Sequence, residues 1–339
     1  MKVALLHNLR PEVTPPGLPD DAFEEYDRSE TIAAITRALE DIPVRVEPVA
    51  ADRRLPWRLD EGKYDLVFNI AEGTGRRCRE AVHAAVCELL GIPITGPDAL
   101  TLAVTLDKAT ARRIVSPEVP IARAVLIESE GDEELLAGLQ YPVIVKPNDE
   151  GSSKGIGSNA VVATPAEGAS RSRWLRSRYG CPVLAEEYLP GKEVTIGIVG
   201  NGAETNVLGM MEIAPKGDET TFVYSFETKR DWRRRVQYHL PPRLPAHVIA
   251  DLQKFALIAY RLLGCRDCAR LDFRLDAGGL PRFIECNALP GLDPENSDIV
   301  SLATPVLSYE KLVQGILLSA MERCGPGMKR STTRTGFVK

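Results

Sequence analysis

Four polar side chains in the last third of the sequence have types and spacing suited to metal and phosphate chemistry. Arg270 and Asp272 are separated by one residue, and so are Glu285 and Asn287. Alternate residues of a β-strand share one face, so two neighbouring strands could bring all four side chains together. Carboxylate and amide oxygens are ligands that Mg²⁺ prefers, usually with substrate phosphates completing its coordination. Asp272, Glu285 and Asn287 are therefore predicted ligands of Mg²⁺, with Mn²⁺ as an alternative ion, although polar residues of an exposed edge strand would give the same pattern.

A second segment is suited to phosphate binding. Lys146 ends the apolar run Val-Ile-Val and precedes a glycine- and serine-rich segment at residues 150–157. Backbone N–H groups and serine hydroxyls in such a loop can surround phosphate oxygens. The loop lacks the Gly-Lys-Ser/Thr ending of a Walker A motif, which argues against a P-loop protein. An ordinary lysine at the end of a strand is the alternative interpretation of Lys146.

The cysteines and histidines of the chain do not indicate a metal or redox site. Cys265 and Cys268 have the spacing of a metal or redox pair, but no second pair or nearby histidine accompanies them. The four histidines of the chain are scattered along it, which disfavours a zinc hydrolase. We expect structural cysteines and a function without zinc.

The elements that must position these residues begin with alternating strands and helices, which is typical of a parallel sheet. Apolar patterning predicts strands at 3–7, 44–49, 64–70 and 92–95, and helices at 29–39 and 81–90. A single helix is expected over 99–115, with Asp107-Lys108 near its middle.

Further strands follow in two groups. The first group surrounds the glycine-rich loop and indicates a compact α+β lobe; its predicted strands are 124–127, 143–145, 160–162 and 183–186. The second group contains the predicted metal ligands and a long helix at 246–263; its predicted strands are 193–199, 206–212, 269–275 and 282–285.

Composition narrows the class of protein. The chain has 339 residues, of which 44% are hydrophobic and 26% charged, as is typical of a globular protein with two or three domains. Its apolar stretches are far shorter than the roughly 20 residues of a membrane span, and its first residues lack the features of a secretory signal. Seven cysteines, an odd number, fit free thiols in a reducing compartment, so we expect a cytoplasmic protein that does not bind membranes. The net charge of -5, with no basic stripe, argues against nucleic acid as a partner.

The order of the motifs along the chain resembles the ATP-grasp superfamily and, within it, the D-alanine:D-alanine ligases. The resemblance extends over about residues 1–323, and Gly-Ile-Pro-Ile-Thr-Gly at 91–96 and Tyr-Ser-Phe-Glu-Thr-Lys at 224–229 also look like family segments. The motifs, in order, are Asp107-Lys108, Val-Lys146-Pro with Glu-Gly-Ser-Ser-Lys-Gly, Glu186-Glu-Tyr-Leu-Pro-Gly-Lys-Glu193, Arg270-Leu-Asp272, and Glu285-Cys-Asn287-Ala-Leu-Pro-Gly291.

This resemblance implies an α/β ATP-grasp fold in which α+β lobes follow an N-terminal Rossmann-like domain. The expected divisions are a Rossmann-like domain at 1–101, a central lobe at 102–188, and a C-terminal lobe with the metal and substrate site at 189–325. The tail at 326–339 lacks apolar periodicity and carries several charges, so we expect it to be disordered. The implied activity is that of an ADP-forming ligase, which phosphorylates a substrate carboxylate with ATP and Mg²⁺ and then joins the acyl phosphate to an amine. The substrates would be small amino acids or carboxylic acids, and homodimers are common in the resembled family. A peptide or amino-acid ligase of secondary metabolism, or a non-catalytic nucleotide-binding protein, are the alternatives.

Roles follow from the resemblance residue by residue, and phosphoryl transfer needs such charged groups rather than a nucleophilic side chain. Residues that match nucleotide-binding positions are Lys108 and Lys146 at the phosphates, Ser152 and Ser153 in the covering loop, Glu186, Tyr188 and Leu189 at the adenine, and Glu193 at the ribose. Residues that match catalytic positions are Lys229 over the γ-phosphate, Arg270 at the developing charge, Ser152, and Gly291 with its backbone N–H. A surface strand-turn-strand and a plain turn glycine are the alternatives for residues 186–193 and for Gly291.

The sequence departs from the family in the expected substrate pocket, which also includes Tyr224. Glu72 stands in place of a family histidine, and arginines at 76, 77 and 79 replace an acidic stretch. Arg230 stands in place of a tyrosine that contacts a serine and a glutamate, the latter matched by Glu25. One additional residue after Gly291 leaves either Asn296 or Ser297 as the match to a carboxylate-binding serine. We therefore expect D-alanine to be a poor substrate, unless Glu72 simply pairs with a neighbouring arginine.

Overall fold

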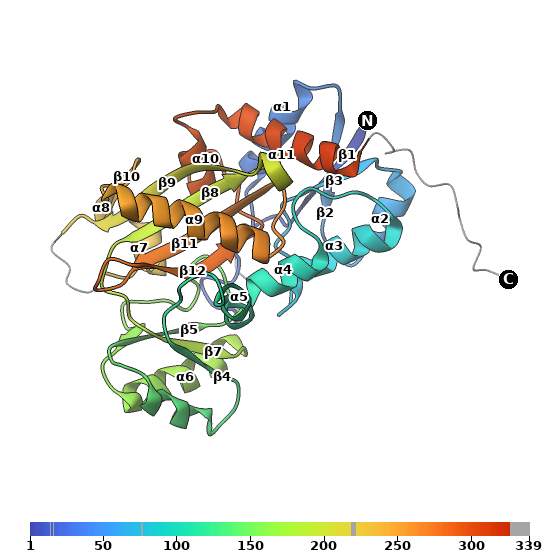
Figure 1. Cartoon of the computed structure of the whole chain (residues 1–339). Coiled ribbons are helices and arrows are strands. Elements are labelled where there is room, and N and C mark those ends of the chain that lie inside the picture. The colour runs from blue at the N-terminus through green and yellow to red at the C-terminus, as the bar shows by residue number, and fades with distance from the viewer. Residues whose placement is uncertain (14, 16, 76, 218–221, 326–339) are drawn as a thin grey trace.

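The computed structural model describes residues 1–13, 15, 17–75, 77–217 and 222–325, so Arg76 and the tail predicted at 326–339 lie outside the described residues. Three sheets with flanking helices make up an α/β protein (Figure 1). Among the described residues, no helix is long and apolar enough to span a membrane.

The N-terminal sheet is parallel, with strand order β2-β1-β3. Its central strand is buried on both faces: Val3 and Leu5 pack toward one cluster of apolar side chains, and Ala4 and Leu6 toward another. Helices cover both faces, as parallel sheets require. The elements are β1 (Lys2–His7), α1 (Ser29–Glu40), β2 (Arg45–Ala50), α2 (Leu55–Gly62), β3 (Leu66–Asn69) and α3 (Arg79–Leu90). The strand predicted at 92–95 is only an isolated bridge between Val67 and Ile94.

The predicted helix over 99–115 is two helices, α4 (Ala99–Leu106) and α5 (Lys108–Val115). The break lies at Asp107, whose backbone is extended and whose carboxylate accepts a hydrogen bond from the backbone N–H of Thr110 at 2.9 Å. Aspartate is a preferred N-cap residue because its side chain satisfies a free N–H of the first turn. The apolar periodicity continues across the break, and the local capping interaction interrupts the helix.

The middle of the chain forms a four-stranded antiparallel sheet with order β4-β7-β5-β6, drawn in green at one end of the molecule in Figure 1. All four strands were predicted, whereas the helix α6 and the short 3-10 helix η1 were not. The elements are β4 (Ala124–Ile127), η1 (Asp132–Gly138), β5 (Val143–Pro147), β6 (Val161–Val162), α6 (Pro165–Tyr179) and β7 (Val183–Glu187).

The last part of the chain forms a five-stranded antiparallel sheet with order β10-β9-β8-β11-β12. Its elements are β8 (Glu193–Val199), η2 (Gly202–Glu204), β9 (Asn206–Pro215), α7 (Phe226–Arg230), α8 (Trp232–Arg235), β10 (Val236–His239), α9 (Ala246–Leu262), β11 (Cys268–Leu275), β12 (Pro281–Asn287), α10 (Asp298–Ala303) and α11 (Tyr309–Cys324). The final helix α11 lies beside α1 (Figure 1), and the Gln314 amide donates a hydrogen bond to the Ala38 carbonyl at 2.8 Å. The two ends of the described chain are thereby packed together.

Candidate functional site

The strands β11 and β12 bring the four polar residues of the proposed metal region together. Their antiparallel register sets Arg270 opposite Asn287, and Asp272 opposite Glu285. A register shift follows Asp272, where the strand pair has a bulge. The side chains that spacing alone suggested are therefore neighbours on one face of the sheet.

The Asp272 carboxylate is oriented by its neighbours. One carboxylate oxygen accepts a hydrogen bond from the Thr195 hydroxyl at 2.6 Å, and the other accepts one from the Arg270 guanidinium at 2.8 Å. Arg270 also pairs with Asp298 at 3.3 Å. Burial by itself would lower the pKa of Arg270, but the charges of Asp272 and Asp298 raise it. No role was predicted for Thr195 or Asp298, because their positions depend on contacts between distant elements.

The Glu285 carboxylate lies among several cations of the site. It is 3.2 Å from the Lys108 ammonium. Although burial would raise the pKa of Glu285, the charges of Lys108, Lys146 and Arg270 lower it to about 2. A carboxylate that stays ionised among cations is suited to share a divalent ion with a phosphate group.

The donor set fits Mg²⁺ bound jointly with a substrate. In the described part of the chain, no group of three or more His, Cys, Asp or Glu side chains converges as a complete metal cage. Mg²⁺ commonly binds through one or two carboxylates, with phosphates and water filling the other positions. Asp272 and Glu285, with the amide oxygen of Asn287 nearby, provide that number of hard oxygen ligands.

Lys146 is fixed by a buried ion-pair cluster at the end of β5. Its ammonium lies 2.5 Å from one oxygen of Glu186, and the Arg112 guanidinium lies 2.7 Å from the other. All three side chains are buried. Burial opposes ionisation of Glu186, but the two cations lower its pKa. The carboxylate of Glu186 therefore serves to position Lys146.

A small cavity between the central and C-terminal sheets collects most of the proposed nucleotide residues. It is lined by Lys146, Ser152, Ser153, Glu186, Tyr188, Leu189, Glu193 and Lys229. Lys108 is the exception, because it lines a neighbouring, larger cavity and donates a hydrogen bond to the Glu150 carbonyl oxygen at 2.5 Å.

Arg274 lines the small cavity and contacts two of the proposed nucleotide residues, Tyr188 and Glu193. Its guanidinium lies over the Tyr188 ring at 4.8 Å from the centroid and donates a hydrogen bond to the Tyr188 hydroxyl at 2.8 Å. It also pairs with Glu193 at 3.4 Å. Burial, despite that pairing, raises the pKa of Glu193 to about 7. Strand alternation after Arg270 and Asp272 was a signal that could have identified Arg274.

The glycine-rich loop is tied to the N-terminal domain. Ser152 and Ser153 have left-handed backbone conformations, with φ of 48° and 58°. The Gly151 N–H donates a hydrogen bond to Glu25 at 2.9 Å, and a Cβ atom at Gly151 would collide with that carboxylate. Glu25 also pairs with Arg79 at 2.9 Å and with Lys154 at 2.5 Å. Glu25 thus links three segments that are far apart in the sequence.

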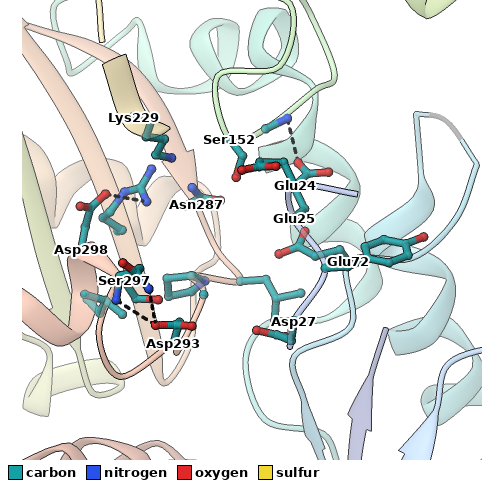
Figure 2. Close-up of a pocket in the computed structure, with 18 of the residues that line it drawn as sticks. Glu24, Glu25, Asp27, Glu72, Ser152, Lys229, Asn287, Asp293, Ser297 and Asp298 are labelled. Carbon is teal, nitrogen blue, oxygen red and sulfur yellow. Dashed lines mark hydrogen bonds and ion pairs between the residues drawn. The ribbon is translucent and has the colours of Figure 1, made fainter. Parts of the chain in front are cut away.

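The larger cavity, of about 730 Å³, lies beside the small one and collects all the proposed substrate residues. Those residues are Glu25, Glu72, Tyr224, Arg230, Gly291, Asn296 and Ser297. The two cavities share Ser152, Tyr224, Lys229, Arg270, Glu285 and Asp298. Figure 2 shows Lys229, Asp298 and Ser297 on one side of the larger cavity and Glu24, Glu25, Asp27 and Glu72 on the other.

Ser297 is better placed than Asn296 to act with Gly291. A Cβ atom at Gly291 would lie 3.4 Å from the Ser297 hydroxyl oxygen, so that hydroxyl is close to the Gly291 backbone. The Asn296 amide instead donates a hydrogen bond to Asp293 at 3.1 Å. Of the two residues that the sequence left open, the geometry favours Ser297.

Arg230 makes a contact that a tyrosine could not make. Its guanidinium pairs with Glu24 at 3.0 Å, and Arg10 pairs with the same carboxylate at 2.9 Å. The segment that carries Lys229 is thereby joined to the N-terminal domain through Glu24, one residue before the expected Glu25. The link is electrostatic and partly exposed to solvent.

Two of the arginines that follow Glu72, Arg77 and Arg79, are paired with other carboxylates. Arg79 pairs with Glu25, and Arg77 pairs with Asp107 at 2.9 Å. Within the described residues, no side chain forms an ion pair with Glu72. Burial, followed by the charges of Glu80 and Glu25, raises the pKa of Glu72 well above its ordinary value.

Comparison with known proteins adds three findings. Residues 119–318 match the family model described as the D-ala D-ala ligase C-terminus. The chain is 32% identical over 299 residues to a D-alanine–D-alanine ligase of Geobacter sulfurreducens, covering 85% of this chain and 87% of that protein. Among solved structures, a D-alanine–D-alanine ligase from Bacillus anthracis complexed with ATP is similar with a TM-score of 0.73 at 20% identity, covering 95% of this chain and 98% of that one. The VanG D-Ala:D-Ser ligase from Enterococcus faecalis is similar with a TM-score of 0.69 at 20% identity, covering 94% and 99%.

Proposed function

Because the chain belongs to the D-alanine–D-alanine ligase family of ATP-grasp proteins, we propose that it is a ligase that activates a carboxylate as an acyl phosphate with ATP and Mg²⁺. An amine then displaces the phosphate to form an amide. The α/β ATP-grasp fold, with its N-terminal Rossmann-like domain, agrees with this assignment. The divisions proposed from the sequence, at 1–101, 102–188 and 189–325, each contain one of the three sheets.

The main observation that supports the proposal is that the two cavities adjoin and share lining residues. Six residues line both of them, and Lys229 and Arg270 are the cations among the six. A γ-phosphate in the small cavity and a carboxylate in the large one would meet beside these cations. Phosphoryl transfer spreads negative charge over the equatorial oxygens, and fixed cations stabilise that charge without a covalent enzyme intermediate.

The first step transfers the γ-phosphoryl group. A carboxylate oxygen of the acid substrate bonds to the γ-phosphorus as the bond to the β-phosphate oxygen breaks, which releases ADP. Lys146, fixed by Glu186, and Lys229 would bind phosphate oxygens. A Mg²⁺ ion held by Asp272, Glu285 and Asn287 would neutralise part of the phosphate charge.

The second step forms the amide bond. The unprotonated amine attacks the acyl carbon, the tetrahedral intermediate expels inorganic phosphate, and the amine nitrogen loses a proton. Arg270 and the Gly291 N–H are suited to stabilise the oxyanion of that intermediate. The hydroxyl of Ser297, close to Gly291, is suited to bind the carboxylate of an amino-acid amine substrate.

The test is the identity of the nucleotide product. We expect ADP and inorganic phosphate to form in equal amounts when the protein is given ATP, Mg²⁺ and a panel of amino acids, with one amide formed per ADP by mass spectrometry. Release of AMP and pyrophosphate would contradict the acyl-phosphate route. Binding of ATP without turnover on any pair would favour a non-catalytic nucleotide-binding protein.

A further inference from the structure

Three carboxylates line the end of the larger cavity away from Lys229, and Figure 2 shows Asp27 and Glu72 on one side and Asp293 beside Ser297. They are Asp27, Glu72 and Asp293, and we call them the acidic wall. Asp293 accepts hydrogen bonds from the Thr31 hydroxyl at 3.1 Å and from the Asn296 amide, both of which are neutral groups. In the described part of the chain, none of the three carboxylates has a cationic partner.

Apart from Glu80, the other largely buried carboxylates of the same cavity are paired. Glu25 contacts Arg79 and Lys154, Glu285 contacts Lys108, and Asp298 contacts Arg270. Partly exposed Glu24 contacts two arginines. The protein therefore provides cations for the carboxylates around the acidic wall and leaves the wall itself without them.

Glu80 is an independent sign of a missing ligand. Its residue is only 7% exposed, and its side chain lines the same cavity from the first turn of α3. Among the described residues, no side chain or backbone group donates a hydrogen bond to its carboxylate or pairs with it. A buried acidic group without a partner costs free energy that a bound cation would offset.

The electrostatics of the wall agree with this interpretation. Burial and the charge of Asp293 raise the pKa of Asp27 to about 7. Burial raises the pKa of Glu80 to about 7; the charge of Arg79 opposes this rise, as do those of Lys108 and Lys154, and the charge of Glu25 adds to it. A positively charged ligand would stabilise the ionised forms of these groups.

The geometry distinguishes an organic cation from a metal ion. Within the described residues, no three acidic, histidine or cysteine side chains converge closely enough to hold a metal. The α-ammonium group of an amino acid would neutralise at most one of the wall carboxylates.

We propose that the acid substrate of this ligase carries a second cationic group, an amine or guanidinium on its side chain, which Asp27, Glu72 and Asp293 bind. This inference rests on the proposed ligase function. It explains why D-alanine is expected to be a poor substrate, because its methyl side chain cannot form an ion pair with the carboxylates of the acidic wall. It also explains why a glutamate is tolerated at position 72 without an arginine of its own.

The experiment compares cationic amino acids with neutral molecules of the same shape. The probes are the D and L forms of ornithine against norleucine, and of arginine against citrulline, each with D-alanine as the amine. ADP release gives kcat/KM, and calorimetry with a non-hydrolysable ATP analogue measures binding without turnover. We expect at least one cationic probe to exceed its neutral partner by about 10- to 100-fold, the usual size of a charged hydrogen-bond contribution.

Matched variants locate the effect. Glu72→Gln and Asp27→Asn are expected to lose most of that preference while keeping ATP binding. Glu295→Gln removes an exposed carboxylate at the same cavity and is expected to retain the preference. A preference that survives both wall substitutions would overturn the assignment of the wall.

The outcomes separate this inference from the proposed function. Turnover that is equal or better with the neutral probes overturns the cationic substrate and leaves the ligase intact. Preferential binding of a cationic probe without ADP release supports the wall and overturns the ligase. Neither turnover nor binding with any cationic probe overturns the inference.

Discussion

Buried carboxylates are paired with cations around the small cavity, whereas those of the acidic wall have no cationic partner among the described residues. Around Lys146, each carboxylate oxygen of Glu186 has a cation within 2.7 Å, and Glu285 is held with a pKa of about 2. At the acidic wall the pKa of Asp27 is raised to about 7, and so is the pKa of Glu80, which lines the same cavity. A site whose charges are internally balanced is preorganised for a ligand common to a whole family. A site left unbalanced depends on its own ligand, and it is also where this sequence departs from the family.

The largest expected effect is on turnover after a change to the balanced region. Glu285→Gln removes a proposed metal ligand and the partner of Lys108, so kcat should fall by about 100- to 1,000-fold or more. Asp272→Asn should act in the same direction. The measurement is ADP release at saturating Mg²⁺, with the melting temperature as a control for folding. Normal turnover in either variant would remove the metal assignment.

A large loss of stability is expected where a balanced cluster is broken. Glu186→Gln leaves the buried cations Lys146 and Arg112 without their carboxylate, and breaking such a cluster typically costs about 3–5 kcal/mol. Urea unfolding of the variant and the parent measures the difference. A loss below about 1 kcal/mol would mean that water or other groups already compensate these charges.

A gain rather than a loss of stability is expected when the unpaired carboxylate of Glu80 is neutralised. The folded-state pKa of Glu80 is about 7, above its ordinary value of 4.5, so the protein loses stability as pH rises from about 4.5 through about 7. Glu80→Gln removes this loss, and it should exceed the parent in unfolding free energy at pH 8 by up to about 3 kcal/mol. At pH 4 the two proteins should be nearly equal. A variant that is less stable than the parent at pH 8 would show that Glu80 already has a cationic partner.

The smallest effect is expected at the exposed link between α7 and the N-terminal domain. Arg230→Ala removes one of two arginines on Glu24, and exposed ion pairs contribute about 0–1 kcal/mol. Stability should therefore change little, whereas KM for ATP should rise because Lys229 is adjacent. Arg233→Ala, which removes another arginine at the same cavity, is the matched control. An equal rise of KM in both variants would assign the effect to net charge.

Sequence patterning identified the sheets better than the helices. The strands β4 and β8 have the predicted bounds, because alternating or continuous apolar residues mark them directly. The helix α6 was missed because the residues that it buries include Gly168, Arg171 and Ser172, which give no apolar periodicity. Its Thr164 N-cap and the following proline were the available signals. The start of this helix is marked by its capping residue and proline rather than by apolar periodicity.

The proposed site was predictable to the extent that its residues are neighbours in sequence. Strand alternation was enough to group Asp272 with Arg270 and Glu285 with Asn287. The partners that set their charge come from elsewhere in the chain, as Asp298 does for Arg270 and Lys108 does for Glu285. The isolation of Glu80 also depends on tertiary packing, because a single sequence contains no signal for a missing partner.

The packing of α11 against α1 has a consequence for how the chain folds during synthesis. Val3 and Leu5 of the first strand share an apolar cluster with Leu312, Val313 and other residues of the last helix. Helix α1 contributes Ile32 and Ile35 to the same cluster, so this face of the sheet is partly covered early and is completed only when α11 has been synthesised. Contacts between such distant segments slow folding, since a long loop must close before they form. The packing around β1 is therefore completed late, and until then part of an apolar surface is open to chaperones.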